Sequence, residues 1–228
     1  RLLESEGCKH ILQEGVTPNF ENAKVAVFTN NTTDVSQGRQ TIEGFTIYTL
    51  CGELAYQLGG KEAYEKIKQN DIDRTAPTSA ILKPIIQNAG TSLILIDELA
   101  DYCVKATSKK VGDGNLFSQT NSFMQTLTEV VSSVPKCVLI ATLPASATEV
   151  ADSQIGQTVL DSLQTRIVRI GSSVKPVDDE EIFEVVRRRL FEQINETSVV
   201  DLVAKRYKDM FHNRYRDLPE YCDKMEYA

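Results

Sequence analysis

The chain has 228 residues, of which 41% are hydrophobic, so it can bury the core of one large domain or two small ones. Its 25 Lys and Arg are outnumbered by 32 Asp and Glu, and the net charge of −7 argues against direct nucleic-acid binding by this chain. Five scattered Cys without a CxxC pair favour a reduced cytoplasmic protein, and the chain has no apolar run of the ~20 residues that a membrane span needs.

Short apolar runs alternate with helical patterns along the chain. Strands are predicted at residues 23–29, 91–96, 136–143 and 165–171, and loops at 30–44 and 111–115. Helices are predicted at 46–67 with a break at Gly59-Gly60, and at 78–88, 101–110, 116–134, 153–163, 180–194 and 199–212. Strands separated by helices predict an α/β fold with a parallel sheet flanked by helices and a C-terminal helical portion.

Two adjacent acids, Asp97 and Glu98, directly follow the second apolar run. A buried parallel strand that ends in carboxylates is typical of the Walker B segment of P-loop NTPases, where the first acid holds Mg²⁺ and the second polarises the attacking water. We therefore predict Asp97 as the ligand of Mg²⁺ and nucleotide, and Glu98 as the catalytic base. The alternative is that both acids only cap the next helix.

The next predicted strand leads to Thr142. In P-loop ATPases the strand beside Walker B ends in a polar residue that senses the γ-phosphate, so Thr142 is the candidate sensor. Ser146, just after Pro144, is the weaker candidate for the same role. A Thr at the end of a strand is also common without any function.

Two arginine positions match sites that AAA-type ATPases use. Arg166 ends a predicted helix directly before a predicted strand, which is where a trans-acting arginine finger lies, and the alternative is a surface ion pair with Asp161. Residues 187–189 are three successive Arg in a later helix, where a lid carries a second sensor Arg. Neighbouring residues lie about 100° apart around a helix, so only one can face a nucleotide, and Arg188 is our candidate. The others are expected to be solvated and paired with Glu184.

A phosphate-binding loop is not found in this sequence. Gly60-Lys61 resembles part of one, but the template G-x-x-x-x-G-K-[ST] needs Gly at Ala55 and Ser or Thr at Glu62. The segment also follows a predicted helix, whereas a phosphate loop follows a strand.

Six stretches share an order and spacing that together are specific. They are TLCGELAYQLGGKEAYE (49–65), TAP (75–77), LILIDELADY (93–102), SFMQTLTEVVSSVP (122–135), LIATLPAS (139–146) and EIFEVVRRRLFE (181–192). They resemble the "domain of unknown function 499" family of large prokaryotic ATP-binding proteins, which are predicted AAA-type P-loop ATPases.

The resemblance implies ATP and Mg²⁺ as cofactors, and a Gly-Lys-Ser/Thr loop upstream of this chain in a longer parent protein. On this view residues 1–175 form a P-loop NTPase core that lacks Walker A, and residues 176–228 form a lid-like helical segment. The family context implies remodelling or DNA transactions in phage defence, a homo-oligomer, and DNA methylase or helicase partners. The alternative is a degenerate NTPase fold that serves as a scaffold or interaction module without hydrolysis.

Overall fold

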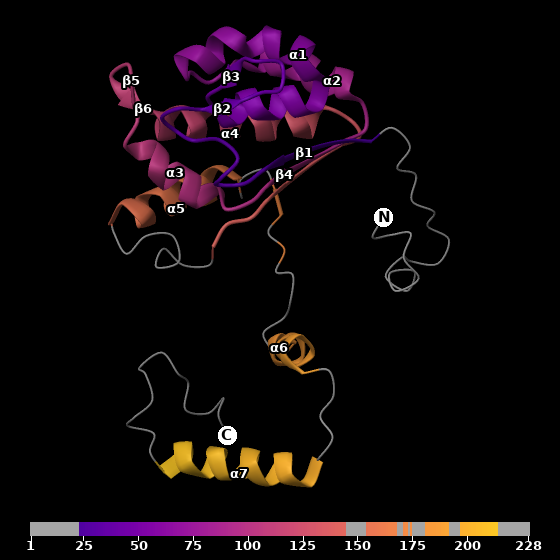
Figure 1. Ribbon diagram of the computed structural model, residues 1–228, viewed down its shortest axis with the longest axis vertical. Coiled ribbons are helices and arrows are strands. Elements are labelled where there is room, and N and C mark those ends of the chain that lie inside the picture. The colour runs from indigo at the N-terminus through magenta and orange to yellow at the C-terminus, as the bar shows by residue number, and fades with distance from the viewer. Residues whose placement is uncertain are drawn as a thin grey trace. The chain divides into compact units, whose positions relative to one another are not determined.

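The computed structural model describes residues 23–144, 154–167, 171–172, 174, 181–191 and 197–213 (Figure 1). The chain divides into two compact units, Arg1–Ser173 and Val174–Ala228. Within the described ranges the first unit holds the strands and helices α1 to α5, and the second holds α6 and α7. None of the helices in these ranges is long and apolar enough to cross a membrane.

Three short strands form a parallel sheet in the order β1-β4-β7. They are β1 (Lys24–Phe28), β4 (Ser92–Ile96) and β7 (Cys137–Ala141). Phe28 lies opposite Ile96, and Ile96 lies opposite Ala141, so the three carboxyl ends meet at one edge. These strands confirm three of the predicted ones, and with the flanking helices they confirm the α/β class.

Helices cover one face of this sheet. Helix α1 (Leu50–Asp73) packs against β1 and α2 (Ser79–Ala89), and α4 (Leu116–Ser133) packs against α2 and β7. Figure 1 shows α1, α2 and α4 together on the same side of the strands. Helices α3 (Leu99–Thr107) and α5 (Gln154–Ile167) pack against each other and against α4. The apolar core between these elements supplies most of the folding free energy, at about 1.5–3 kcal/mol for each large side chain that is fully buried.

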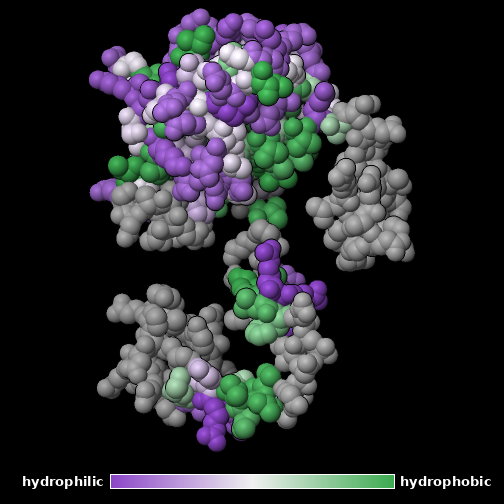
Figure 2. Space-filling view, in the orientation of Figure 1, coloured by the Kyte–Doolittle hydropathy of each residue, from purple (hydrophilic) through white to green (hydrophobic). Residues whose placement is uncertain are grey.

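The opposite face of the sheet is exposed among the described residues. The covered face carries the buried side chains of Ala26, Phe28, Ile94 and Ile96. The exposed face carries Val25, Val27, Val138 and Ile140, and Val138 is 54% exposed. Figure 2 shows this region as an apolar patch over the strands. Uniformly apolar strands predict burial on both faces, so the described structure departs from that expectation on one side.

Helix α1 is two helices joined at a break, as predicted. Gly59 and Gly60 have non-helical backbone angles, and Gly60 has φ 63°. A side chain at Gly60 would meet no neighbouring atom, so the left-handed backbone is what favours glycine there. The second half of α1 folds back toward the first. Asp71, near the end of the second half, accepts a hydrogen bond of 2.5 Å from the hydroxyl of Thr49, just before the first half.

Short strand pairs replace two of the predicted loops and one helix start. In the segment predicted as a loop and a helix start, β2 (Arg39–Gln40) pairs with β3 (Thr46–Ile47). Helix α1 therefore begins only after Thr49. The Thr49 hydroxyl caps this helix by accepting a hydrogen bond from the Gly52 amide at 3.1 Å. Farther along, β5 (Lys110–Val111) and β6 (Gly114–Asn115) form a hairpin directly before α4. Asn115 caps α4 through a reciprocal capping box with Ser118.

The predicted strand at 165–171 is wrong where the structure describes it, because α5 continues through Ile167. Val159 and Leu163 are buried, and Ile167, four residues later, packs against the same core. This helical spacing buries more apolar surface than a short strand would. Residues 168–170 lie outside the described part.

The second unit contains α6 (Ile182–Leu190) and α7 (Thr197–Asn213), which confirm the last two predicted helices. Each helix exposes apolar side chains, including Val185 and Val186 on α6 and Leu202 and Val203 on α7. The acidic residues 178–180, which are predicted to begin the helix that contains α6, lie outside the described residues.

Candidate functional site

Backbone hydrogen bonds continue the parallel pairing one residue beyond the strand ends. The Asp97 amide donates to the Phe28 carbonyl at 2.8 Å, and the Thr142 amide donates to the Ile96 carbonyl at 2.9 Å. Asp97 and Thr142 therefore follow two neighbouring strands, β4 and β7, at the carboxyl edge of the sheet. In open α/β sheets this edge is the usual place for a ligand.

Three of the predicted site residues meet in one small network. The Thr142 hydroxyl donates to Asp97 Oδ1 at 2.5 Å. The Glu98 amide donates both to Asp97 Oδ1 at 3.1 Å and to Thr142 Oγ1 at 3.2 Å. The Thr142 hydroxyl thus donates its single proton to the Asp97 carboxylate and accepts the Glu98 amide proton with a lone pair.

Glu98 has an unusual backbone conformation. Its φ of 53° and ψ of 38° are left-handed, and it occupies the residue before α3 without a side-chain capping bond. A left-handed conformation costs a non-glycine residue roughly 1–2 kcal/mol. The alternative in which both acids cap the next helix therefore fails for the Glu98 side chain, which is exposed.

The turn formed by Asp97 and Glu98, between β4 and α3, is also held from the side of β1. Asn30 Nδ2 donates to Asp101 Oδ2 at 3.2 Å, which ties the end of β1 to the first turn of α3. Leu99 is buried, and the ring of Tyr102 packs edge-on against Phe28 with centroids 5.0 Å apart. Sequence reasoning missed Asn30 and Asp101, although the position of Asn30 just after a predicted strand was an available signal.

The residues present fit one side of a Mg²⁺ site. Asp97 is exposed, and among the described residues its Oδ2 atom accepts no hydrogen bond while Oδ1 is engaged. Mg²⁺ on a nucleotide needs only one or two carboxylates, because water and phosphate oxygens complete its six ligands. Across the described ranges no group of three or more His, Cys, Asp or Glu could hold a metal, so a cage made only of protein side chains is not present there.

No cradle for phosphates lies beside these residues in the described part of the chain. Gly60-Lys61 is at the break within α1, between two helical segments, as expected for a segment that is not a phosphate loop. The described residues therefore show an acidic cluster at the sheet edge without a phosphate loop beside it.

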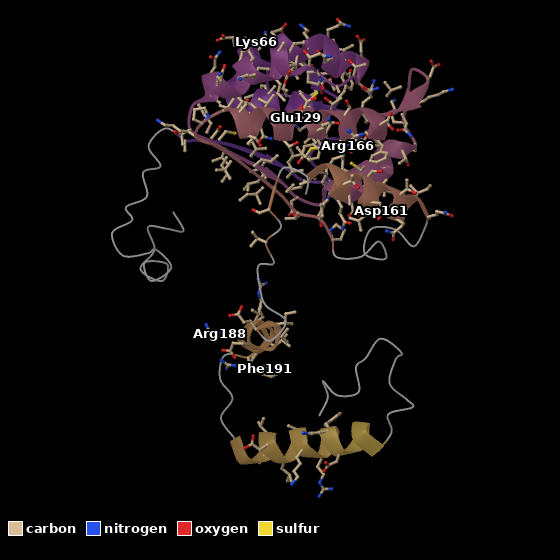
Figure 3. The ribbon with its side chains drawn as sticks, turned by 180° about the vertical axis from the view of Figure 1, so that it is seen from behind. Lys66, Glu129, Asp161, Arg166, Arg188 and Phe191 are labelled. Carbon is tan, nitrogen blue, oxygen red and sulfur yellow. The ribbon has the colours of Figure 1, made fainter. Side chains whose placement is uncertain are left out.

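Each of the two predicted arginines bonds to a side chain that is not part of this network. Arg166 lies on the side of α5 that faces α4, where its Nη1 donates to Oε1 of Gln125 (Figure 3). Asp161, the expected surface partner of Arg166, accepts instead from Gln157 at 2.7 Å. Arg188 is on α6 of the second unit, and its Nε donates to Glu184 at 2.8 Å. Ser146 lies outside the described residues.

The described cysteines offer no competing nucleophilic site. Cys51 and Cys103 are free and buried, and Cys137 is free and half-buried. Burial raises the pKa of Cys51 to about 12 and raises that of Cys103 as well. Both therefore stay neutral thiols near pH 7, and a neutral thiol is a poor nucleophile.

Fold and site together define an α/β protein with paired acids and a threonine at the carboxyl edge of a parallel sheet. The family model described as "DUF499 N-terminal domain" matches residues 10–176. Because this match covers more than half of the chain, the protein belongs to the DUF499 family, and the sequence resemblance is confirmed. No curated protein and no solved structure matches the chain.

Proposed function

We propose that this chain carries the metal-binding and water-activating half of the ATP site of an AAA-type P-loop ATPase. Asp97 would hold Mg²⁺, and Glu98 would act as the general base that takes a proton from the attacking water. ATP and Mg²⁺ are the proposed cofactors. The single observation that carries this proposal is the meeting of Asp97, Glu98 and Thr142 at the carboxyl edge of a parallel sheet.

The strained backbone of Glu98 supports a chemical role. Gly, or less often Asn, takes the left-handed conformation at lower free energy than Glu does. The Glu98 carboxylate makes no capping bond that would offset this cost. Stability therefore gives no reason for a Glu at this position, and strained residues of this kind cluster at functional sites.

At one edge of the sheet, the side chain of Gln57 bonds to the backbone of Val27. Gln57 Oε1 accepts from the Val27 amide at 2.7 Å, and Gln57 Nε2 donates to the Val27 carbonyl at 2.9 Å. This amide takes the place that a neighbouring strand would have beside β1. Gln57 also donates to Glu53 at 2.7 Å, and Arg39 holds Glu53 through two bonds of 2.8 and 3.0 Å.

Among the described residues, the other edge of the sheet, along β7, is available for a further strand that would lead to a phosphate loop. Among the described residues β7 pairs only with β4, and its five residues carry no charge or proline that would discourage a further strand. We propose that a strand of the longer parent protein pairs parallel to β7. The Gly-Lys-Ser/Thr loop after this strand would then emerge at the edge that holds Asp97.

The wider assignments are also proposals. Arg166 would act as a finger toward a neighbouring subunit of a homo-oligomer after leaving Gln125, and Arg188 would face the nucleotide after leaving Glu184. Residues 176–228 would form a lid. The parent ATPase would serve remodelling or DNA transactions in prokaryotic phage defence, in the cytoplasm, with DNA methylase or helicase partners.

Calorimetry on the parent protein tests the proposal directly. We expect ATP binding that depends on Mg²⁺, and we expect Asp97→Ala to remove this dependence because the variant lacks the carboxylate ligand. Asp73→Ala is the matched control, since Asp73 is an exposed acid on α1 whose carboxylate accepts a hydrogen bond from Gln69 of the same helix. Binding of ATP that is absent, or equal with and without Mg²⁺, contradicts the proposal.

The exposed face of the sheet favours a second candidate, a scaffold or interaction module without hydrolysis. Val25 and Val27 on β1, and Val138 and Ile140 on β7, present apolar side chains on either side of β4, and such patches often mark protein interaction sites. A scaffold would show no Mg²⁺-dependent affinity for ATP in the same calorimetry.

A further inference from the structure

We propose that Thr142 is a positioning residue that holds the Asp97-Glu98 turn in shape before any ligand binds. This role differs from γ-phosphate sensing, the role that the sequence predicts for Thr142. Its relevance to metal binding rests on the proposed function, whereas its effect on the turn can be measured in the chain alone.

The hydroxyl of Thr142 bonds to both acidic residues at once. It donates to Asp97 Oδ1 at 2.5 Å and accepts from the Glu98 amide at 3.2 Å. The Thr142 amide is itself fixed to the carbonyl of Ile96, so the hydroxyl is held by the sheet. A side chain that acts as donor and acceptor from this place links β7 to both residues of the turn.

The strain at Glu98 makes this link necessary. A left-handed Glu persists only where the surrounding structure holds it. On the helix side the turn is held by the burial of Leu99 and by the bond from Asn30 to Asp101. On the strand side, the described residues give the Glu98 amide two acceptors, Asp97 Oδ1 and Thr142 Oγ1. Loss of the hydroxyl removes one of these acceptors and the donor that fixes the other.

The same link prepares Asp97 for a metal. Thr142 and the Glu98 amide both use Oδ1, so Oδ2 remains available while the rotation of the carboxylate is restrained. A restrained carboxylate binds a cation more tightly than a rotating one, because less conformational entropy is lost on binding.

Nuclear magnetic resonance on the full chain, without metal, tests the hold on the turn. Thr142→Val keeps the shape of the side chain but removes the hydroxyl. We expect amide exchange at Glu98 to become about tenfold faster, as for the loss of one hydrogen bond, and its coupling constant and carbon shifts to leave the left-handed range. Thr142→Ser should restore both. Thr158→Val is the control, because the Thr158 hydroxyl donates to the Gln154 carbonyl of its own helix.

An unchanged exchange rate and left-handed φ at Glu98 in Thr142→Val would overturn the proposal. If that variant does not fold, Thr142→Ala provides the same comparison. Mn²⁺ is then added as a paramagnetic probe, and we expect it to broaden the Asp97 and Glu98 signals at about tenfold higher concentration in Thr142→Val than in the wild type. Loss of the left-handed turn in a protein whose wild type never responds to Mn²⁺ would support the hold on the turn and refute metal binding by this chain in the absence of a nucleotide.

Discussion

Two acids of this protein, Asp71 and Asp97, contrast in how their carboxylates are satisfied. Asp71 is fully buried and accepts from the Tyr48 amide at 3.0 Å, the Thr49 hydroxyl at 2.5 Å and the Tyr64 hydroxyl at 2.9 Å. Asp97 is exposed, and within the described residues only its Oδ1 atom accepts hydrogen bonds.

The contrast distinguishes an acid that holds the fold from one that is available for chemistry. Burial raises the pKa of Asp71, and the donors from Thr49, Tyr48 and Tyr64 offset part of that rise. Two of these donors come from the residues just before α1 and the third from its second half, so Asp71 ties the start of α1 to its second half. Asp97 joins a strand end to a strained turn and keeps an oxygen free, which a purely structural acid would not need.

The largest expected effect is on hydrolysis. Glu98→Gln in the parent protein should slow ATP turnover by at least about 100-fold, because an amide cannot accept the proton of the attacking water. ATP binding and the melting temperature should stay as in the wild type, so the variant should trap ATP. Turnover assays and filter binding measure the two quantities.

Glu62→Gln is the control for this variant, since Glu62 is an exposed acid on α1 near Lys66. If Glu98→Gln turns over ATP as fast as the control does, Glu98 is not the catalytic base, and the proposed functional difference between this acidic pair and Asp71 is refuted.

The next effect in size is on stability. Asp71→Ala should lower the free energy of unfolding by about 3 kcal/mol, because the Thr49 hydroxyl and the Tyr48 amide lose the carboxylate that accepts from them, and the Tyr64 hydroxyl keeps only the Thr46 carbonyl at 3.2 Å. Urea denaturation measures the change. Asp73→Ala, two residues away and exposed, should change the free energy of unfolding by less than about 0.5 kcal/mol. Equal losses in the two variants would refute the structural role of Asp71.

The smallest effect separates strain from function at Glu98 itself. Glu98→Gly should raise the free energy of unfolding by about 1 kcal/mol, because glycine takes the left-handed conformation without a Cβ clash. The same variant should lose hydrolysis. A rise in stability together with a loss of turnover would be the signature of a residue retained for activity.

Lys136→Gly is the matched control for strain. Lys136 is exposed and also has a positive φ, 64°, in the residue before β7. We expect a similar gain in stability there with no change in turnover. A stability loss in Glu98→Gly alone would mean that the Glu98 side chain stabilises the fold after all.

Local signals in the sequence were sufficient for most elements. The three strands of the sheet and the break at Gly59-Gly60 follow from apolar runs and from glycine pairs, which act over a few residues. The predicted strand at 165–171 failed because the contribution of Ile167 depends on the core that α5 shares with α3 and α4. That core is made by residues distant in the sequence, so alternation over seven residues could not reveal it.

The candidate site divides in the same way. The order of an apolar run, two acids, a second apolar run and a threonine was enough to nominate Asp97, Glu98 and Thr142. The bond between Thr142 and Asp97 joins residues 45 apart, and the partnership of Asn30 with Asp101 joins residues 71 apart. Sequence spacing carries no distance information at such separations.

The sequence by itself determined the family, the apolar strands and the acids that follow one of them, because these depend on residue type and local order. Only the tertiary structure decided that Glu98 is left-handed, that Gln57 bonds to the Val27 backbone at one edge of the sheet, and that one apolar face is exposed among the described residues. Each of these depends on which strands become neighbours, and strand pairing is set by the packing of the whole domain.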